Sequence, residues 1–326
     1  MQQTVEGNGF FSRAMHWCKV NIPWQWVKKI LTWCFFILIA WLLIQQAMTI
    51  EWQQVFETIK QTSKISLLTG FLLAVCCYIA FGSYDLLGRY LTGIKASVAK
   101  VWFIAWLSYA FNLNLGAAVG GVAFRYRLYS KVGVSTGDTT RIIGFSVLTN
   151  WLGYIALAGV LFVSGQIEPP ASWQVGKLGI QILGAVFIGV IFAYLAACGF
   201  SRKRQFSIRD FTLTLPKIHF AFLQLAMASL HWLLMASVIY QFMPEDIAFA
   251  TVFAVLLVSA IAGAVTHIPG GLGVIEAVFV ALLAGQADKP AIIAALFAYR
   301  CVFYLAPLGL ATAAYFIFEA FVRDKQ

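Results

Sequence analysis

The sequence predicts an all-α polytopic membrane protein with about six full spans and two re-entrant helical hairpins of opposite orientation, or eight spans by conventional counting. Two observations predict this fold. The 326 residues are 61% hydrophobic and only 11% charged, a composition typical of membrane proteins and not of soluble domains. In addition, two of the long apolar stretches are each interrupted by a polar, glycine-rich segment.

Six segments are apolar over roughly the 20 residues that a spanning helix needs. They comprise residues 29–46, 65–88, 142–164, 178–199, 218–242 and 291–318. Residues 1–28 are basic, and no cleavage pattern follows the first span, so we expect them to remain as a cytoplasmic segment. Residues 29–318 then form a single transmembrane domain, and residues 319–326 form a cytoplasmic tail.

The two interruptions have a similar character. Residues 110–121 read Ala-Phe-Asn-Leu-Asn-Leu-Gly-Ala-Ala-Val-Gly-Gly, and residues 264–276 read Ala-Val-Thr-His-Ile-Pro-Gly-Gly-Leu-Gly-Val-Ile-Glu. Lipid offers no hydrogen-bond partner to a bare backbone, so such breaks persist at membrane depth only beside protein or a wet cavity. A matched pair of breaks, one in each half of the chain, points to the substrate site of a transporter-like fold.

The positive charges indicate how the chain crosses the membrane. Four short segments, 1–29, 89–100, 123–141 and 200–217, hold most of the 23 Lys and Arg residues. The net charge of +10 therefore reflects membrane topology and not nucleic-acid binding. The positive-inside rule places all four segments in the cytoplasm. That placement requires residues 97–121 to enter from the cytoplasm and return to it.

By parity, residues 247–285 form a second hairpin that enters from the opposite face. Hairpins of opposite orientation predict two pseudo-inverted halves, at about residues 65–164 and 218–318. Both chain termini are then cytoplasmic. The conventional alternative reads the second hairpin as two separate helices and counts eight spans.

Arg300 is the strongest candidate for a functional side chain. It lies roughly 15 Å from the outer end of the last span by helical rise, a depth at which charges are costly and usually functional. Glu276 is the acid at similar depth, and Tyr304 lies one turn beyond Arg300. Either Arg300 and Glu276 form an ion pair that pins the last helix to the second hairpin, or the guanidinium fork faces an anionic group such as phosphate.

Glu276 itself has two interpretations. It lies in the first turn of the helix after the break, where a carboxylate is stabilised by the helix dipole. The same helix end is also suited to face an anion. Pro307 is expected to kink the last helix just beyond Tyr304.

Asn112, Asn114 and His267 lie at or near the breaks. They either satisfy loose backbone or line the substrate site, and Arg125 is a further candidate for contact with a headgroup. The glycines and the proline of the breaks either permit tight turns or allow close helix packing. These are Gly116, Gly120 and Gly121 in the first break and Pro269, Gly270, Gly271 and Gly273 in the second.

Asp85 and Arg89 are four residues apart near the inner end of their span, so we predict an interfacial ion pair between them. Elsewhere the sequence shows no catalytic pattern. It contains no phosphate-binding P-loop, no G-x-S-x-G elbow, no H-E-x-x-H motif and no Cys/His spacing for a metal. We therefore expect a protein that is not an enzyme and that needs no cofactor or metal.

The motifs resemble those of a known family. His-Ile-Pro-Gly-Gly-Leu-Gly-Val-Ile-Glu at 267–276, followed by Ala-Tyr-Arg at 298–300, resembles the lysylphosphatidylglycerol synthase transmembrane-region family. The segments around Asn112, Gly120, Arg125 and 149–154 are similar to its inner-membrane members in Gram-negative bacteria. The family motif falls here on Pro269, Gly270, Gly271, Gly273, Glu276 and Arg300.

The resemblance covers nearly the whole chain and implies a location in the bacterial inner membrane. In two-domain members of the family, the membrane region is similar to a lipid flippase and a separate soluble domain attaches lysine to phosphatidylglycerol. This sequence stops just after the membrane part. The resemblance therefore implies lipid handling without aminoacyl transfer.

We expect a flippase, transporter or binding protein for membrane phospholipids, whose hairpins meet near the midplane and bind an anionic headgroup. Two alternatives stay open. One is a secondary transporter of a small soluble anion. The other is a non-transporting scaffold that docks a lipid-synthesising enzyme on its basic segments 123–141 and 200–217.

Overall fold

The computed structural model describes residues 52–165, 176–202, 205–208, 211–266 and 269–323, together with positions 34, 37, 41, 44, 45 and 48. The chain divides into two units, Met1–Glu51 and Trp52–Gln326. The second unit contains both hairpins and the last helix. The predicted first span, residues 29–46, lies largely outside the described residues.

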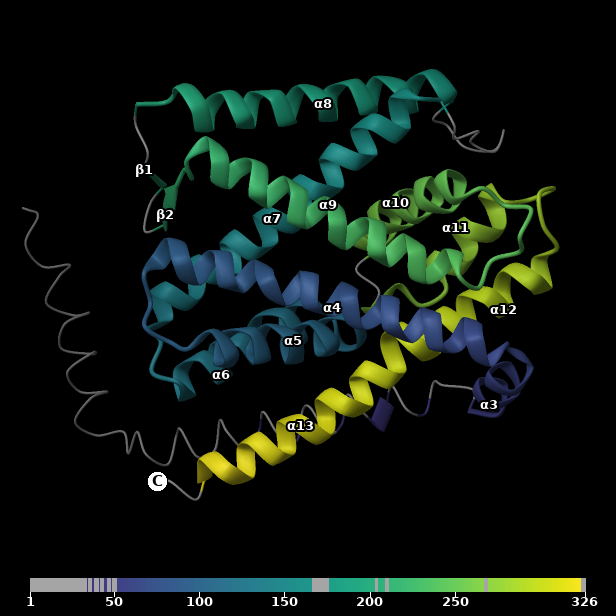
Figure 1. Cartoon of the computed structure of the whole chain (residues 1–326), viewed down its shortest axis with the longest axis horizontal. Helices are drawn as coiled ribbons and strands as arrows, with labels where there is room; N and C mark the ends of the chain where they lie inside the picture. Colours follow the sequence, from purple (N-terminus) through teal and green to yellow (C-terminus); the bar gives the residue numbers. More distant parts are fainter. Residues whose placement is uncertain are drawn as a thin grey trace, which may run out of the picture. The chain divides into compact units, whose positions relative to one another are not determined.

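Long apolar helices form the framework of this unit. After the short helix α3 (Trp52–Gln61), the helices α4 (Lys64–Thr92), α7 (Thr136–Val163) and α9 (Ile218–Tyr240) all pack against one another (Figure 1). Helix α8 (Lys177–Phe200) packs against α7 and α9. Its large apolar side chains, such as Leu178 and Phe192, are exposed, as expected for a helix that faces lipid.

The ends of these helices follow from local sequence. Gly93 ends α4 in the left-handed conformation, with φ of 69°. Ser135 caps α7, because its hydroxyl accepts a hydrogen bond of 3.1 Å from the backbone N–H of Asp138. Asp138 also places a negative charge in the first turn of α7, where the helix dipole favours it.

The first break folds into a helical hairpin. Helix α5 (Val98–Leu115) ends at Gly116, where φ is 84°, and the π-helix η1 (Ala117–Ala123) runs back along α5 into α6 (Phe124–Lys131). At Gly120 the two backbones touch, since an added Cβ would lie 2.2 Å from the backbone nitrogen of Asn112. Only glycine fits there. Close packing is thus the reason for Gly120, and a turn is the reason for Gly116.

The second break also folds into a hairpin. Helix α10 (Phe249–Thr266) is followed by the 3-10 turn η2 (Pro269–Gly271) and by α11 (Val274–Leu282), which packs back against α10 (Figure 1). Gly270, Gly271 and Gly273 have φ values of 65°, 57° and 78°. The tight-turn interpretation of these glycines is therefore confirmed, because L side chains rarely adopt such angles.

The last part of the chain is a long interrupted helix. It consists of α12 (Lys289–Arg300), the π-helix η3 (Cys301–Leu305) and α13 (Ala306–Arg323). The chain changes direction where α12 and α13 meet (Figure 1). The irregular turn lies directly before Pro307, which agrees with the predicted kink.

Among the described residues, six helices are long and apolar enough to cross a membrane. Five of them, α4, α7, α8, α9 and the stretch Lys289–Glu319, coincide with predicted spans. The sixth is α10, which the sequence analysis predicts to be one arm of a re-entrant hairpin. Its 18 residues extend over about 27 Å, enough by length for a full span. Helix α5 is not among the six.

One segment differs from the all-α prediction. Residues Gln205–Ile208 (β1) and Phe211–Thr214 (β2) form a short antiparallel pair of strands within the basic segment 200–217. Both strands alternate polar and apolar residues, with Phe206 paired to Leu213 and Ser207 to Thr212. This period of two favours a strand pair over a helix.

Candidate functional site

The tips of the two hairpins meet. The turn η2 packs against α5, and a Cβ added to Gly270 would lie 3.1 Å from the carbonyl oxygen of Leu113. Leu113 is three residues before the turn at Gly116. The two breaks, which are more than 140 residues apart in the sequence, are thus brought into contact.

Arg300 binds the tip of the second hairpin. Its Nε donates to Glu276 Oε1 at 2.5 Å and its Nη2 donates to Glu276 Oε2 at 3.0 Å. Its Nη1 and Nη2 also donate to the carbonyl oxygens of Gly270 and Gly271, each at 3.1 Å. The positive φ of both glycines turns these successive carbonyls toward the guanidinium. Arg300 therefore pins the end of α12 to the hairpin tip, as the first interpretation of the pair proposed.

The ion pair is mostly but not fully buried. The Arg300 side chain is 11% exposed and that of Glu276 is 26% exposed. Glu276 lies three residues after Gly273, the N-cap of α11, so its carboxylate also faces the positive end of that helix. The more accessible partner is thus the acid.

Tyr304 lies where the spacing predicts. The Arg300 Cζ atom is 5.3 Å from the centroid of the Tyr304 ring, a cation–π distance. Tyr304 belongs to η3, and the carbonyl oxygens of this π-helix accept side-chain donors from other helices. Asn114 Nδ2 donates to the Tyr304 carbonyl at 3.4 Å, and the Tyr78 hydroxyl donates to the Phe303 carbonyl at 3.0 Å. Asn114 thus ties the first hairpin to the helix that carries Arg300.

Asn112 supports the first hairpin. Its backbone carbonyl accepts the N–H of Gly116 at 3.0 Å. Its side chain lies against Gly121, where an added Cβ would be 2.9 Å from Asn112 Oδ1. Both facts connect Asn112 to the packing of η1 on α5.

Arg125 lies in a different cluster. It forms a bidentate pair with Asp85, with Nε–Oδ2 and Nη2–Oδ1 distances of 3.0 and 3.2 Å, and its Nη1 donates to the Gly121 carbonyl at 2.9 Å. The Tyr129 hydroxyl donates to Asp85 at 2.9 Å. The side chains of Arg125 and Asp85 are 5% and 0% exposed. All three nitrogens of Arg125 thus face protein acceptors.

This cluster corrects the predicted Asp85–Arg89 pair. Arg89 Nε donates instead to the carbonyl oxygen of Ala96 at 2.6 Å, and Asp85 is bonded to Arg125 and Tyr129. The prediction was wrong because helical spacing places two residues on one face but does not reveal a stronger partner from another helix. Burial and the Asp85 charge raise the pKa of the Tyr129 hydroxyl far above its ordinary value, so it remains a donor.

A second ion-pair cluster joins the first hairpin to the last helix. Glu319 accepts a hydrogen bond of 2.8 Å from Arg127 Nη2 and also pairs with Lys131. Arg127 Nε donates to the Tyr315 hydroxyl at 3.1 Å. These contacts fix α6 against α13.

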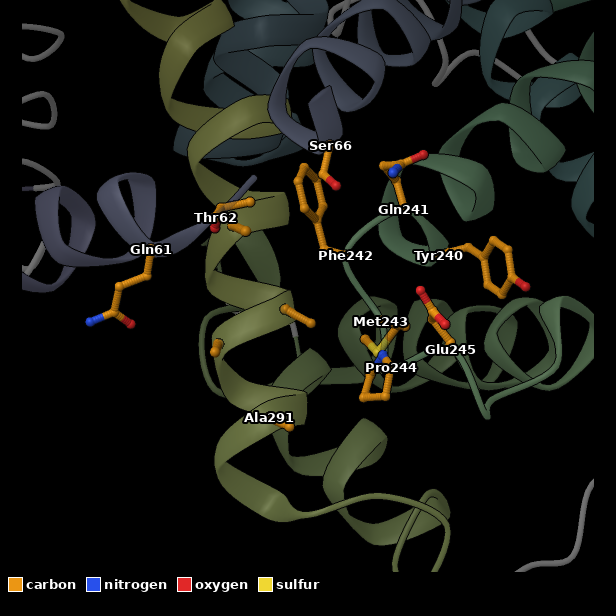
Figure 2. Close-up of a pocket in the computed structure, with 13 residues that line it drawn as sticks. Gln61, Thr62, Ser66, Tyr240, Gln241, Phe242, Met243, Pro244, Glu245 and Ala291 are labelled. Carbon is orange, nitrogen blue, oxygen red and sulfur yellow. The ribbon is translucent and has the colours of Figure 1, made fainter. Parts of the chain in front are cut away.

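A cavity of about 610 Å³ lies near the start of α4, the end of α9 and the start of α12 (Figure 2). Its polar lining comprises Gln61, Thr62, Ser66, Tyr240, Gln241 and Glu245, and its apolar lining comprises Phe242, Met243, Pro244, Ala291, Ala294, Ala295 and Ala298. Glu245 is the one charged side chain in this lining. Ala298 precedes Arg300 by two residues, or about 200° around the helix, so the cavity and Arg300 lie on opposite sides of α12.

The sequence reading missed a buried aromatic and polar cluster around His231. The His231 ring forms a hydrogen bond of 3.2 Å between its Nε2 and the Tyr109 hydroxyl, and its Nδ1 lies 3.3 Å from Cys77 Sγ. Phe81 stacks on Tyr109 with ring centroids 3.7 Å apart. The signal available in the sequence was a polar residue in the middle of a predicted span. The members of the cluster come from three different helices, α4, α5 and α9, so their pairing could not be read from the sequence. The described residues contain no group of three or more potential metal ligands.

The candidate residues therefore fall into two groups. Arg300, Glu276, Gly270, Gly271, Tyr304 and Asn114 are linked at the hairpin tips, whereas Arg125 belongs to the Asp85 cluster. His267 lies outside the described residues. The resulting tip site holds a cation that is paired with a partly exposed acid and with the backbone carbonyls of Gly270 and Gly271.

Comparison with known proteins gives similar relatives. The chain is 42% identical over 303 residues to the inner membrane protein YbhN of Escherichia coli (strain K12), which covers 93% of this chain and 95% of that protein. It is 30% identical over 312 residues to an uncharacterized protein of Synechocystis sp., covering 93% and 96% of the two chains.

A more distant relative is the phosphatidylglycerol lysyltransferase of Staphylococcus haemolyticus. That match is 23% identical over 287 residues and covers 85% of this chain but only 32% of the relative. In addition, residues 26–311 match the family model described as the lysylphosphatidylglycerol synthase TM region. With helices of spanning length and composition and a match over most of its length, the chain is an integral membrane protein that belongs to the lysylphosphatidylglycerol synthase transmembrane-region family.

Proposed function

We propose that this protein binds the phosphate of a phospholipid headgroup where its two hairpin tips meet, and moves that lipid between leaflets. The observation that carries the proposal is the placement of Arg300. A guanidinium, the natural bidentate partner of phosphate, is held at the crossing of two helix breaks. Charges at such depth in membrane segments are usually functional.

In this proposal both hairpins are re-entrant. The hairpin of α5 and η1 enters from the cytoplasm, and that of α10 and α11 enters from the opposite face. The exclusion of α5 from the helices of spanning character supports the first of these assignments. The basic residues of 89–100 and 123–141 support it as well, because both ends of the first hairpin are then cytoplasmic.

The structure represents the closed form of the site in this scheme. Glu276 occupies the guanidinium fork, and a lipid phosphate replaces it when the site opens. The exchange is favoured by the exposure of Glu276, at 26%, which leaves it accessible to a competing anion. Arg300 remains bonded to the carbonyls of Gly270 and Gly271 throughout, so it keeps its position while its anionic partner changes.

We place the protein in the bacterial inner membrane, with both termini in the cytoplasm. The name of the Escherichia coli relative supports the membrane assignment. We further propose that the chain has no catalytic activity and acts without a cofactor. Membrane phospholipid is its partner in this scheme.

The described cavity lends no support to transport of a small soluble anion. A transporter of soluble anions needs a water-filled path that attracts negative charge. None of the residues that line this cavity is Lys or Arg, and Glu245 carries a negative charge at its edge. This lining is therefore not that of a pathway for free anions, and the proposed phosphate site lies on the other side of α12.

Transport in proteoliposomes tests the proposal. The protein is reconstituted with an acyl-labelled phospholipid, and transfer between leaflets is measured by quenching the label from outside. Wild-type protein is expected to accelerate transfer, and Arg300→Gln is expected to remove most of the acceleration. The matched control is Arg141→Gln, since the Arg141 side chain is 55% exposed and pairs with Asp138 instead of with a residue of the tips.

Two further measurements keep the result interpretable. Size-exclusion chromatography and thermal unfolding establish that Arg300→Gln is folded, and Arg300→Lys supplies a variant that keeps the charge but lacks the fork. Transfer at the wild-type rate in folded Arg300→Gln would overturn the proposal. Uptake of labelled inorganic phosphate without lipid transfer would instead favour the small-anion transporter.

A further inference from the structure

We infer that the lipid at the hairpin tips carries both a phosphate and an ammonium group, with a net charge of zero. This inference rests on the proposed function and narrows its substrate. It follows from the charge balance of the tip site, in which one cation and one anion are held together.

The Arg300–Glu276 pair sets the charge of the closed site. Arg300 and Glu276 contribute one positive and one negative charge, and the hydroxyl groups nearby belong to neutral tyrosines such as Tyr304. The site is therefore neutral when it is closed. With side-chain exposures of 11% and 26%, neither charge is well solvated by its surroundings.

A phosphate that enters the site changes this charge balance. A lipid phosphate that takes the fork of Arg300 displaces the Glu276 carboxylate from its hydrogen bonds. With a purely anionic headgroup, the site then holds two negative charges against one positive charge. An uncompensated charge in a poorly solvated site is strongly unfavourable.

An ammonium group on the same headgroup removes this imbalance. The phosphate pairs with Arg300 while the ammonium pairs with the released Glu276, so both ions keep a partner and the total charge stays at zero. In an ethanolamine headgroup two carbon atoms separate the two charged groups. That short spacing matches adjacent protein partners that are in direct contact with each other, at 2.5 and 3.0 Å.

The cavity across α12 from Arg300 offers a second, separate place for an ammonium group. Figure 2 shows Glu245, Gln241 and Ser66 among its labelled lining residues. Carboxylate, amide and hydroxyl oxygens all accept hydrogen bonds, and an ammonium group has three donors. The lining offers no Lys or Arg to a phosphate. The lining of this cavity therefore suits the amine of a headgroup better than its phosphate.

The experiment compares three acyl-labelled lipids in proteoliposomes of wild-type protein. They are phosphatidylethanolamine, N-acetylated phosphatidylethanolamine and phosphatidylglycerol. The first has both charged groups, the second has lost only its ammonium charge, and the third is anionic from the start. We expect transfer of phosphatidylethanolamine to be about tenfold faster than that of the other two, a ratio that corresponds to about 1.4 kcal/mol.

Glu276→Gln supplies the decisive variant. Without the acid, the site carries a net positive charge, and we expect the preference to shift toward phosphatidylglycerol. Glu245→Gln is expected to lower transfer of phosphatidylethanolamine alone, about threefold. Asp246→Asn is the matched control, because this neighbouring acid does not line the cavity.

The outcomes are distinguishable. If phosphatidylglycerol and the N-acetylated lipid move as fast as phosphatidylethanolamine in wild-type protein, the inference is wrong and the proposed function stands. If no lipid moves, both fall. If Glu276→Gln does not fold, the comparison of the three lipids in wild-type protein still decides the question.

Discussion

Tyr78 and Phe303 are joined by a hydrogen bond of 3.0 Å, in which the Tyr78 hydroxyl donates to the Phe303 carbonyl oxygen. Pro307, four residues after Phe303, has no N–H to donate to that carbonyl. Tyr78 belongs to α4, so a side chain from another helix supplies the hydrogen-bond donor that the proline lacks. The irregular turn that follows Arg300 is thereby tied into the bundle.

Tyr78→Phe is expected to lower the free energy of unfolding by about 1–2 kcal/mol, because a buried carbonyl loses its donor while the ring remains. The measurement is thermal or denaturant unfolding in detergent, with Tyr90→Phe as control. Tyr90 is 66% exposed, so its hydroxyl contributes little to folding. Equal stability of the two variants would mean that the hydrogen bond of Tyr78 does not contribute to the free energy of unfolding.

Gly270→Ala and Gly273→Ala separate two reasons for glycine at the second hairpin tip. Both positions have positive φ, at 65° and 78°, so each alanine is expected to cost about 1–2 kcal/mol in backbone strain. Only Gly270 also faces the Leu113 carbonyl, at 3.1 Å from an added Cβ, whereas Gly273 has open space around it. Gly270→Ala should therefore be the more destabilising in thermal unfolding. The reverse order would argue against contact between the two tips.

Arg300 and Glu276 are expected to be coupled in a double-mutant cycle. Arg300→Gln and Glu276→Gln should each destabilise the protein by about 2 kcal/mol, less than the removal of one partner from a fully buried pair, because Glu276 is 26% exposed. The double variant should lose less than the sum of the two, since neither side chain then leaves an unpaired charge. Strict additivity in the unfolding measurements would show that the pair contributes nothing as a pair.

Asp85→Asn is expected to destabilise the protein by about 3–5 kcal/mol, because it leaves the buried Arg125 without its anion. Arg89→Gln removes one hydrogen bond to a carbonyl and should cost about 1 kcal/mol. Comparison of the two midpoints of unfolding tests whether Asp85 pairs with Arg125 or with Arg89. A pair between Asp85 and Arg89 would make the two losses similar.

Cysteine labelling tests the orientation of the hairpins. With the native cysteines replaced, Lys95→Cys and Ser130→Cys lie before α5 and within α6, and a re-entrant first hairpin places both on the cytoplasmic side. Glu245→Cys and Gln286→Cys flank the second hairpin and should both react from the opposite side. A membrane-impermeant maleimide on intact and on inverted vesicles distinguishes these cases. Reaction of Lys95→Cys and Ser130→Cys from different sides would show that α5 and η1 cross the membrane.

Much of the framework follows from hydropathy alone. Each of α4, α7, α8 and α9 begins and ends within a few residues of its predicted span, apart from the earlier start of α7 at Thr136. That start is set by the Ser135 cap, which is a local hydrogen bond and not a property of the apolar stretch. Averaged hydropathy cannot report such an end.

The pairing of Arg300 with Glu276 could be predicted from the sequence, whereas the partners of Asp85 and Tyr78 could not. The depth of Arg300 and Glu276 along the chain, and the glycines of the second break, were sufficient to bring these residues together. In contrast, the partner of Asp85 is 40 residues away on another helix, and that of Tyr78 is 225 residues away. Such pairings depend on how helices rotate against one another, which a single sequence does not encode in any periodicity.

The direct contact of Gly120 with the backbone of α5 has a mechanical consequence. Because no side chain separates the two main chains at this point, no side chain can change rotamer to let them move. We therefore expect the first hairpin to be rigid there. Any relative movement of the two tips is then expected to come from the second hairpin, whose turn contains three glycines in the left-handed conformation. In the proposed transport cycle the first hairpin would thus be the stationary element and the second hairpin the mobile one.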